Sequence, residues 1–183
     1  IENLLNFMNK NKNGEIDLQD GLAAIFTNKE VIFGSKSKDW IRFLFPQVEG
    51  QFKVDIEKID CFEINENWFF QIEEIKDTNY GPIKTNNEFT VLLDGEKLSE
   101  LILIRGKKDG DKFQPLGMEK GNIKLSDFFI NEKVIQAARE KWPLVTDCND
   151  RIIWVPGYRP SQEYRITEST KKIIKMSVSK KIS

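Results

Sequence analysis

Short apolar runs separated by turn-forming residues dominate residues 16 to 104, and they constrain the fold more than any other feature of the sequence. Most of the runs are too short for helices, and several alternate apolar and polar side chains as half-buried strands do. Turn signals stand between them at Phe45-Pro46, Asn79 to Pro82 and Asp94-Gly95. Strands are therefore predicted at residues 22–26, 31–33, 40–45, 52–56, 68–75, 89–93 and 101–104.

The second half of the chain adds one helix to this pattern of strands. A helix is predicted over residues 126–139, where Ser126 or Asp127 can cap the first turn and Pro143 follows the end. Further strands are predicted at residues 151–155 and 172–178. The predicted fold class is α+β: a mostly antiparallel β-sandwich with a short helical segment packed on it.

The length of 183 residues suits one ample core, and 39% hydrophobic with 31% charged residues is ordinary for a soluble globular chain. Leu4, Leu5 and Met8 follow helical spacing with Ile1, so residues 1–13 are predicted to be the end of a connecting helix. One β-rich domain is predicted over residues 14–178, and a frayed tail over residues 179–183.

Histidine is absent from the chain, which excludes serine–histidine and cysteine–histidine catalysis and every histidine–metal site within it. Cys61 and Cys148 lie far apart without metal-ligand spacing, so two buried reduced thiols and no metal site are predicted. No apolar stretch approaches the roughly 20 residues that span a bilayer, and the first residues lack the pattern of a signal peptide. A reducing, aqueous compartment and no membrane contact are expected.

One stretch imitates a calcium-binding loop. Residues 9–20 place Gly14 and Ile16 where an EF-hand loop has its glycine and its apolar residue. Only Asp17 and Asp20 would supply anionic side chains, and Asp20 is too short to act as the final bidentate ligand. The favoured alternative is an Asn/Gly turn that leads into a strand.

The overall formal charge of −1 conceals an asymmetry between the two halves. Residues 1–100 carry 11 Lys and Arg against 19 Asp and Glu, whereas residues 101–183 carry 17 against 10, so the second half has a net charge of +7. A basic surface of this kind favours nucleic-acid binding through counterion release. The alternative is a solvated lysine-rich face that serves only solubility.

Residues 105–117 combine cations with residues that stiffen a loop. A tight Asp-Gly turn at Gly110 follows the strand that ends near residue 104, Pro115 fixes its own φ, and Gly117 permits a backbone path that other residues avoid. A stiff loop loses little entropy when its cations meet phosphates. The lysines that it presents are Lys107, Lys108 and Lys112.

Taken together, these motifs resemble the C-terminal domain of the tRNA(Ile)-lysidine synthetase family. The shared pattern is a strand-closing Arg, a G-D-[RK]-F-x-P-x-G loop, a K-[KL]-[LS]-x-[FL]-[FL] helix start, an R-x-x-x-P segment and a G-[YW]-R turn. The matching residues are Arg105; Gly110, Asp111, Lys112, Phe113, Pro115 and Gly117; Lys124, Leu125, Phe128 and Phe129; Arg139 and Pro143; and Gly157, Tyr158 and Arg159. The close match covers about residues 90–178.

The resemblance implies an ATP-dependent ligase that attaches lysine to the wobble cytidine of an isoleucine tRNA. The family's S-G-G-x-D-S signature does not occur in these residues, so no catalytic residue is expected here, and the ATP, Mg²⁺ and lysine sites are expected upstream in the longer parent. The chain is expected to hold tRNA, near its acceptor stem, beside the parent's own catalytic domain. A bacterial cytoplasm is the expected location, with an organelle stroma as the alternative.

A tRNA holder needs cations that neutralise phosphates, because duplex RNA is read mainly by its shape. The candidates are Arg105, Lys107, Lys108, Lys112, Lys124, Arg139, Arg159, Arg165, Lys171 and Lys172. Structural roles stay open for several of them, since Arg105 can pair with Asp111, Arg139 can anchor the helix, and Lys171 and Lys172 can belong to a solvated edge strand.

Other motif residues are expected to shape the scaffold. They are Gly110, Asp111, Phe113, Pro115, Gly117, Pro143 and Gly157. The aromatic residues Phe113, Phe128, Phe129 and Trp154 are expected in the core rather than as stacking platforms for bases. A second function class also stays open: a protein-interaction or packing module, similar to a domain of the phenylalanyl-tRNA synthetase β-subunit.

Overall fold

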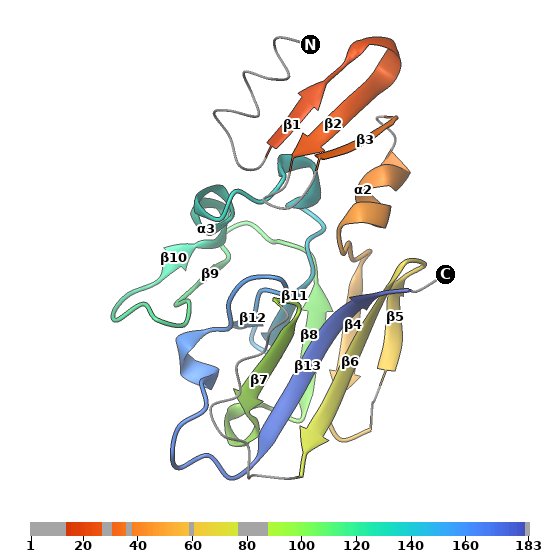
Figure 1. Cartoon of the computed structure of the whole chain (residues 1–183). Coiled ribbons are helices and arrows are strands. Elements are labelled where there is room, and N and C mark those ends of the chain that lie inside the picture. Colours follow the sequence, from red (N-terminus) through yellow and green to blue (C-terminus); the bar gives the residue numbers. More distant parts are fainter. Residues whose placement is uncertain (1–13, 27–30, 36–37, 59–60, 77–87, 182–183) are drawn as a thin grey trace.

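Two four-stranded antiparallel sheets face each other and form the frame of the molecule (Figure 1). The structure is a computed structural model and describes residues 14–26, 31–35, 38–58, 61–76 and 88–181. The first sheet has the order β12 (Ile152–Trp154), β11 (Leu144–Asp147), β8 (Leu101–Arg105) and β4 (Gln51–Asp55). The second has the order β5 (Cys61–Asn65), β6 (Trp68–Ile75), β13 (Ile173–Lys180) and β7 (Thr90–Asp94).

The inner faces of both sheets bury one apolar cluster. Ile102 and Ile104 of β8 point into it, and Phe70 and Ile72 of β6 approach from the opposite sheet. These residues stand two apart along their strands, because successive side chains of a strand point to opposite faces. The alternation that predicted the strands is therefore the same pattern that fills the space between the sheets.

The helical segment packs at one end of the sandwich (Figure 1). Leu144 and Ile152 belong to a second apolar cluster. The same cluster contains Phe128 of α3 (Leu125–Asn131) and Ala138 of the short 3₁₀ helix η3 (Gln136–Ala138). The predicted α+β class, a mostly antiparallel sandwich with a helical segment packed on it, is confirmed.

The helical segment is less regular than the prediction of one helix over residues 126–139. Lys133 adopts a left-handed φ of 55° and ends α3 in a Schellman motif. In this motif Val134 N–H donates to Phe129 O at 2.9 Å, and Lys133 N–H donates to Ile130 O at 3.1 Å. The chain then turns and continues as η3.

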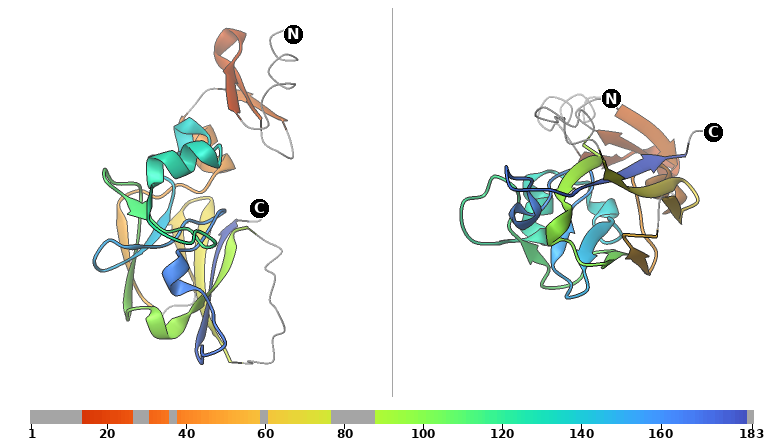
Figure 2. Two further views of the ribbon diagram at one scale, coloured as in Figure 1. Left: turned by 90° about the vertical axis from the view of Figure 1, so that its left-hand side faces the viewer. Right: turned by 90° about the horizontal axis from the view of Figure 1, so that it is seen from below.

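A small three-stranded sheet precedes the sandwich in the chain. Its order is β1 (Gly14–Asp17), β2 (Leu22–Phe26) and β3 (Val31–Ser35), with the 3₁₀ helix η1 (Gln19–Gly21) between the first two strands. Ile25 of β2 belongs to the second apolar cluster. The left view of Figure 2 shows the helical segment between this sheet and the sandwich.

The predicted strand over residues 40–45 is wrong. Residues Lys38–Leu44 form helix α2, and Trp40, Ile41, Leu44 and Phe45 pack against the second cluster. Their spacing of one, three and four residues places them on one side of a helix. A short apolar run of this kind fits a buried strand equally well until its packing partners are known.

Several other expectations concern the ends of the chain. β13 runs through Ser179 and Lys180, two residues into the predicted tail. The predicted connecting helix over residues 1–13 lies outside the described residues. So do residues 9–13 of the calcium-loop candidate, whose residues 14–17 form strand β1.

The prediction of two buried thiols is wrong, because Cys61 and Cys148 are both exposed. Cys61 begins the edge strand β5, and Cys148 follows β11 in a turn. Among the helices of the described ranges, none has the length and apolar character needed to cross a membrane.

Candidate nucleic-acid interface

Arg105 closes β8, and its guanidinium lies at the centre of a buried ion network. The side chain is only 2% exposed. Its NH1 and NH2 groups donate to the Asp111 carboxylate at 2.9 and 2.8 Å, and Nε donates to Asp150 Oδ1 at 2.7 Å. NH1 also donates to Gly106 O at 2.9 Å. The hydrogen-bond donors of the Arg105 guanidinium thus bind acids of the same chain. The alternative role of Arg105, a structural pair with Asp111, is confirmed.

This network joins two loops. Asp111 also accepts Lys108 N–H at 2.7 Å, which fixes the turn after β8, while Asp150 lies in the turn between β11 and β12 with a φ of 62°. Lys108 Nζ donates to both oxygens of Asp150, at 2.8 and 3.0 Å. The Lys108 hydrogen bond and the Arg105 guanidinium lower the pKa of Asp150. Burial opposes the charge of Arg105, but the two carboxylates outweigh it and raise the pKa of the guanidinium.

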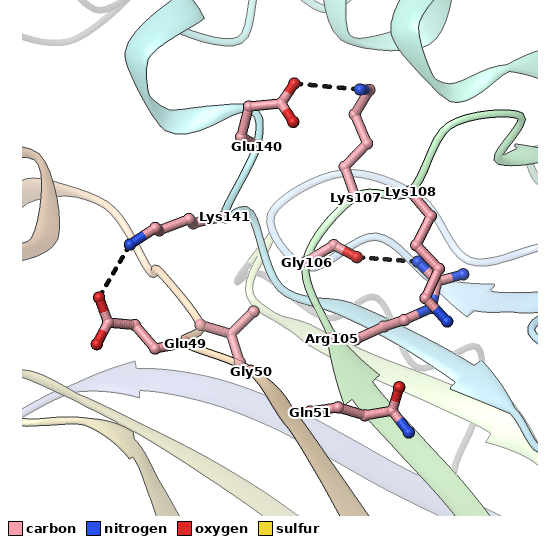
Figure 3. Close-up of a pocket in the computed structure, with 10 residues that line it drawn as sticks. Glu49, Gly50, Gln51, Arg105, Gly106, Lys107, Lys108, Glu140 and Lys141 are labelled. Carbon is pink, nitrogen blue, oxygen red and sulfur yellow. Dashed lines mark hydrogen bonds and ion pairs between the residues drawn. The ribbon is translucent and has the colours of Figure 1, made fainter.

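A pocket of about 450 Å³ opens beside the network, where β8 ends and β4 begins (Figure 3). It is lined by residues 48–51, 105–108, 140 and 141. Acids neutralise its lysines: Lys107 Nζ donates to Glu140 Oε1 at 3.1 Å, and Lys141 Nζ donates to Glu49 Oε1 at 2.9 Å. Hydrogen bonding to Lys141, together with the charges of Arg42 and Lys141, lowers the pKa of Glu49. The pocket therefore has a mixed, largely paired charge.

Sequence reasoning missed three of these pocket residues, Glu49, Glu140 and Lys141. The signal that finds them is a close backbone approach: Lys107 N–H donates to Glu140 O at 3.1 Å, and a Cβ on Gly106 would lie 2.8 Å from the same oxygen. Segments 106–107 and 140–141 thus lie against each other. The sequence of either segment alone does not predict that contact.

Lys112 and Lys124 lie on a two-stranded antiparallel ribbon formed by β9 (Lys112–Phe113) and β10 (Ile123–Lys124). The register places Lys124 directly opposite Lys112, and both residues are exposed. Neither side chain makes an ion pair or hydrogen bond with another residue that the structure describes. The ribbon thus holds two adjacent cations that have no acidic partner in the described part of the chain.

Arg139 and Arg159 lie beside the helical segment. Arg139 is half-buried, and its Nε and NH2 groups donate to Val134 O at 2.9 and 2.8 Å, so it anchors the turn after α3. Arg159 is 54% exposed and forms an ion pair with Glu132 at 3.6 Å. The alternative role of Arg139 as a helix anchor agrees with these contacts.

The remaining candidates lie beside the 3₁₀ helix that precedes β8, at the end of the sandwich where β8 begins. Arg165 follows η4 (Gln162–Tyr164), and its carbonyl accepts from Lys97 of η2 (Gly95–Lys97). Lys171 N–H donates to Glu96, and Lys172 Nζ lies 3.6 Å from Glu74. The ten predicted cations therefore do not form a single surface.

The residues expected to shape the scaffold are well anchored. Gly110, Gly117 and Gly157 have positive φ values of 84°, 91° and 81°. A Cβ on Gly157 would lie 2.9 Å from the ring of Phe89, so this position requires glycine. Pro115 forms a bridge with Ser161, which ties the loop after β9 to the segment before η4.

The aromatic residues of the motif are buried. Phe113, Phe128 and Phe129 are at most 3% exposed, and Phe113 and Phe128 make an edge-to-face contact with ring centroids 5.0 Å apart. Trp154 is 1% exposed, and Pro143 is also buried. The expectation that these rings form core rather than stacking platforms is confirmed.

Comparison with known proteins identifies a matching family model and a solved structure of similar fold. Residues 102–177 match the model of the TilS substrate C-terminal domain. The fold is similar to a crystal structure of a TilS C-terminal domain, with a TM-score of 0.60 and 22% identity, covering 73% of this chain and all of that chain.

Relatives of known name match almost the whole chain. The tRNA(Ile)-lysidine synthase of Caldanaerobacter subterraneus subsp. tengcongensis is 31% identical over 182 residues, which cover 98% of this chain and 36% of the relative. The synthase of Clostridium tetani is 31% identical over 182 residues, covering 96% of this chain and 38% of the relative. The chain thus spans little more than a third of these relatives. It corresponds to the C-terminal part of the tRNA(Ile)-lysidine synthases, as its motifs predicted, and residues 102–177 carry the TilS C-terminal domain.

Proposed function

We propose that this chain binds tRNA as the C-terminal part of a tRNA(Ile)-lysidine synthase. The observation that carries the proposal is the match of residues 102–177 to the TilS substrate C-terminal domain. The exposed lysines of the β9–β10 ribbon supply a surface for the phosphate backbone, which is the main source of affinity for a protein that recognises folded RNA by shape. The proposed contact region of the tRNA is its acceptor stem.

The activity of the whole protein is part of the same proposal. We propose an ATP-dependent ligase that attaches lysine to the wobble cytidine of an isoleucine tRNA, with ATP and Mg²⁺ bound by segments outside this sequence. In this proposal the chain binds and orients the tRNA and supplies no reacting group. The catalytic domain of the same protein is its second partner. A cytoplasmic location is proposed because the named relatives are bacterial.

A salt titration tests the binding function. The chain is titrated with an isoleucine tRNA transcript between about 50 and 200 mM salt, and the logarithm of the association constant is plotted against that of the salt concentration. A steep negative slope is expected, because each neutralised phosphate releases counterions. No binding, or binding that salt leaves unchanged, would reject the proposal, and the second result would favour a packing module with a dry apolar interface.

A further inference from the structure

The β9–β10 ribbon forces two like charges together. In antiparallel pairs the positions alternate between hydrogen-bonded and non-hydrogen-bonded pairs. Leu125 N–H donates to Asp111 O at 2.8 Å, one position beyond the pair formed by Lys112 and Lys124. The two lysines therefore occupy a non-hydrogen-bonded pair, in which the Cα atoms lie only about 4.5 Å apart and the side chains share one face.

The opposite face of the ribbon holds this arrangement in place. Phe113 is 3% exposed and Leu125 is fully buried, and both belong to the second apolar cluster, against which Ile123 also packs. Because side chains alternate along a strand, burial of these neighbours turns Lys112 and Lys124 toward solvent. A slip of one residue would bury a lysine, so the register is strongly specified.

Like charges directly opposite each other destabilise an antiparallel pair. In the turn after β8, by contrast, the lysines lie beside acids, since Lys107 pairs with Glu140 and Lys108 pairs with Asp150. The ribbon lysines have no such partner among the described residues. The fold thus places two cations side by side and leaves both available to an anion from outside.

We propose that Lys112 and Lys124 form one binding site for two neighbouring backbone phosphates of a tRNA helix. This assignment rests on the proposed function and locates the contact within it. Mutual repulsion keeps the two ammonium groups apart, so each takes its own phosphate. Two phosphates of one strand present separate negative charges at short spacing, and flexible lysine side chains meet them as point charges. The site reads the backbone and carries no base specificity.

The test compares variants of the chain in the same tRNA titration. Lys112→Ala with Lys124→Ala should weaken binding about tenfold and reduce the magnitude of the salt slope by about 2, one for each phosphate contact. Lys112→Arg with Lys124→Arg keeps both charges and should bind within about threefold of the unchanged chain. Lys112→Gln with Lys124→Gln repeats the neutralisation with longer side chains and should match the alanine pair.

The matched control is Lys58→Ala with Lys76→Ala, which removes the same charge from exposed positions that follow β4 and β6 at the far end of the sandwich. Its affinity and slope should stay close to those of the unchanged chain, and thermal melts should show that all variants fold. If both neutral pairs keep the original affinity and slope, the phosphate site is rejected while tRNA binding stands. If the unchanged chain itself fails to bind tRNA, both proposals fall.

Discussion

The turn after β8 and the β9–β10 ribbon are adjacent in the sequence, and both are rich in lysine, yet the two segments differ in whether their cations form ion pairs. In the turn, Lys107 and Lys108 each meet a carboxylate, and Arg105 is buried between Asp111 and Asp150. On the ribbon, Lys112 and Lys124 face solvent without an acidic partner among the residues that the structure describes. The difference teaches that the count of cations in a segment says little about which of them are available for binding.

The strongest test of this comparison removes the buried guanidinium. Arg105→Ala should lower the free energy of unfolding by about 3–5 kcal/mol, because it leaves the carboxylate of Asp111, whose side chain is 8% exposed, buried without its partner. Urea unfolding measures the effect. Lys108→Ala is the control, since its pair with the half-exposed Asp150 is worth at most about 1 kcal/mol. Equal losses from the two substitutions would break the distinction between scaffold and surface.

Sequence alone predicted much of the fold, because alternation directly encodes which face of a strand is buried. Residues 68–75 illustrate this, and they lie in a strand of the sandwich. The pattern failed at residues 40–45, where a run of bulky apolar side chains satisfies strand and helix alike and its packing partners decide. It also overlooked β11 (Leu144–Asp147), whose two faces are both buried.

The candidate site was less predictable, because availability of a charge depends on distant residues. Arg105 meets a carboxylate 45 positions away, and Lys107 meets one 33 positions away. No local spacing reveals such partners. By contrast, the pair of Lys112 and Lys124 is set by the burial of their immediate neighbours, so the motif that contains them points to the site.

A smaller effect concerns acid stability. Asp150 has a folded pKa below its ordinary 3.8, owing first to the Lys108 hydrogen bond and then to Arg105. A depressed carboxyl pKa contributes stability above the unfolded value, and this contribution is lost as pH falls through the folded value. Asp150→Asn should therefore be less stable than the unchanged chain at neutral pH, by less than about 1 kcal/mol after solvent screening. The two unfolding curves should converge well below pH 3.8; a constant difference at every pH would contradict the ion pair.

The smallest expected effect has the opposite sign. Lys112→Gln removes one of two opposed like charges, so the free energy of unfolding should rise by up to about 0.5 kcal/mol at low salt. Salt screens repulsion between exposed charges, and the gain should vanish near 1 M salt, where the Debye length is about 3 Å. Urea unfolding at both salt levels measures it, with Lys53→Gln, a substitution at an exposed position of β4, as control. A loss of stability at low salt would show that Lys112 supports the ribbon.

The anchoring of the ribbon also decides where the chain tolerates insertions. The loop after β9 is fastened by Leu116 N–H to Pro160 O at 2.8 Å and by Gly117 N–H to the side chain of Gln162 at 2.9 Å, whereas residues 119–122 are exposed. Extra residues placed among 119–122 should bulge outward, since core contacts fix Phe113 and Leu125 on either side. This short arc is therefore suited to length variation, or to a grafted peptide tag, without rotating the ribbon.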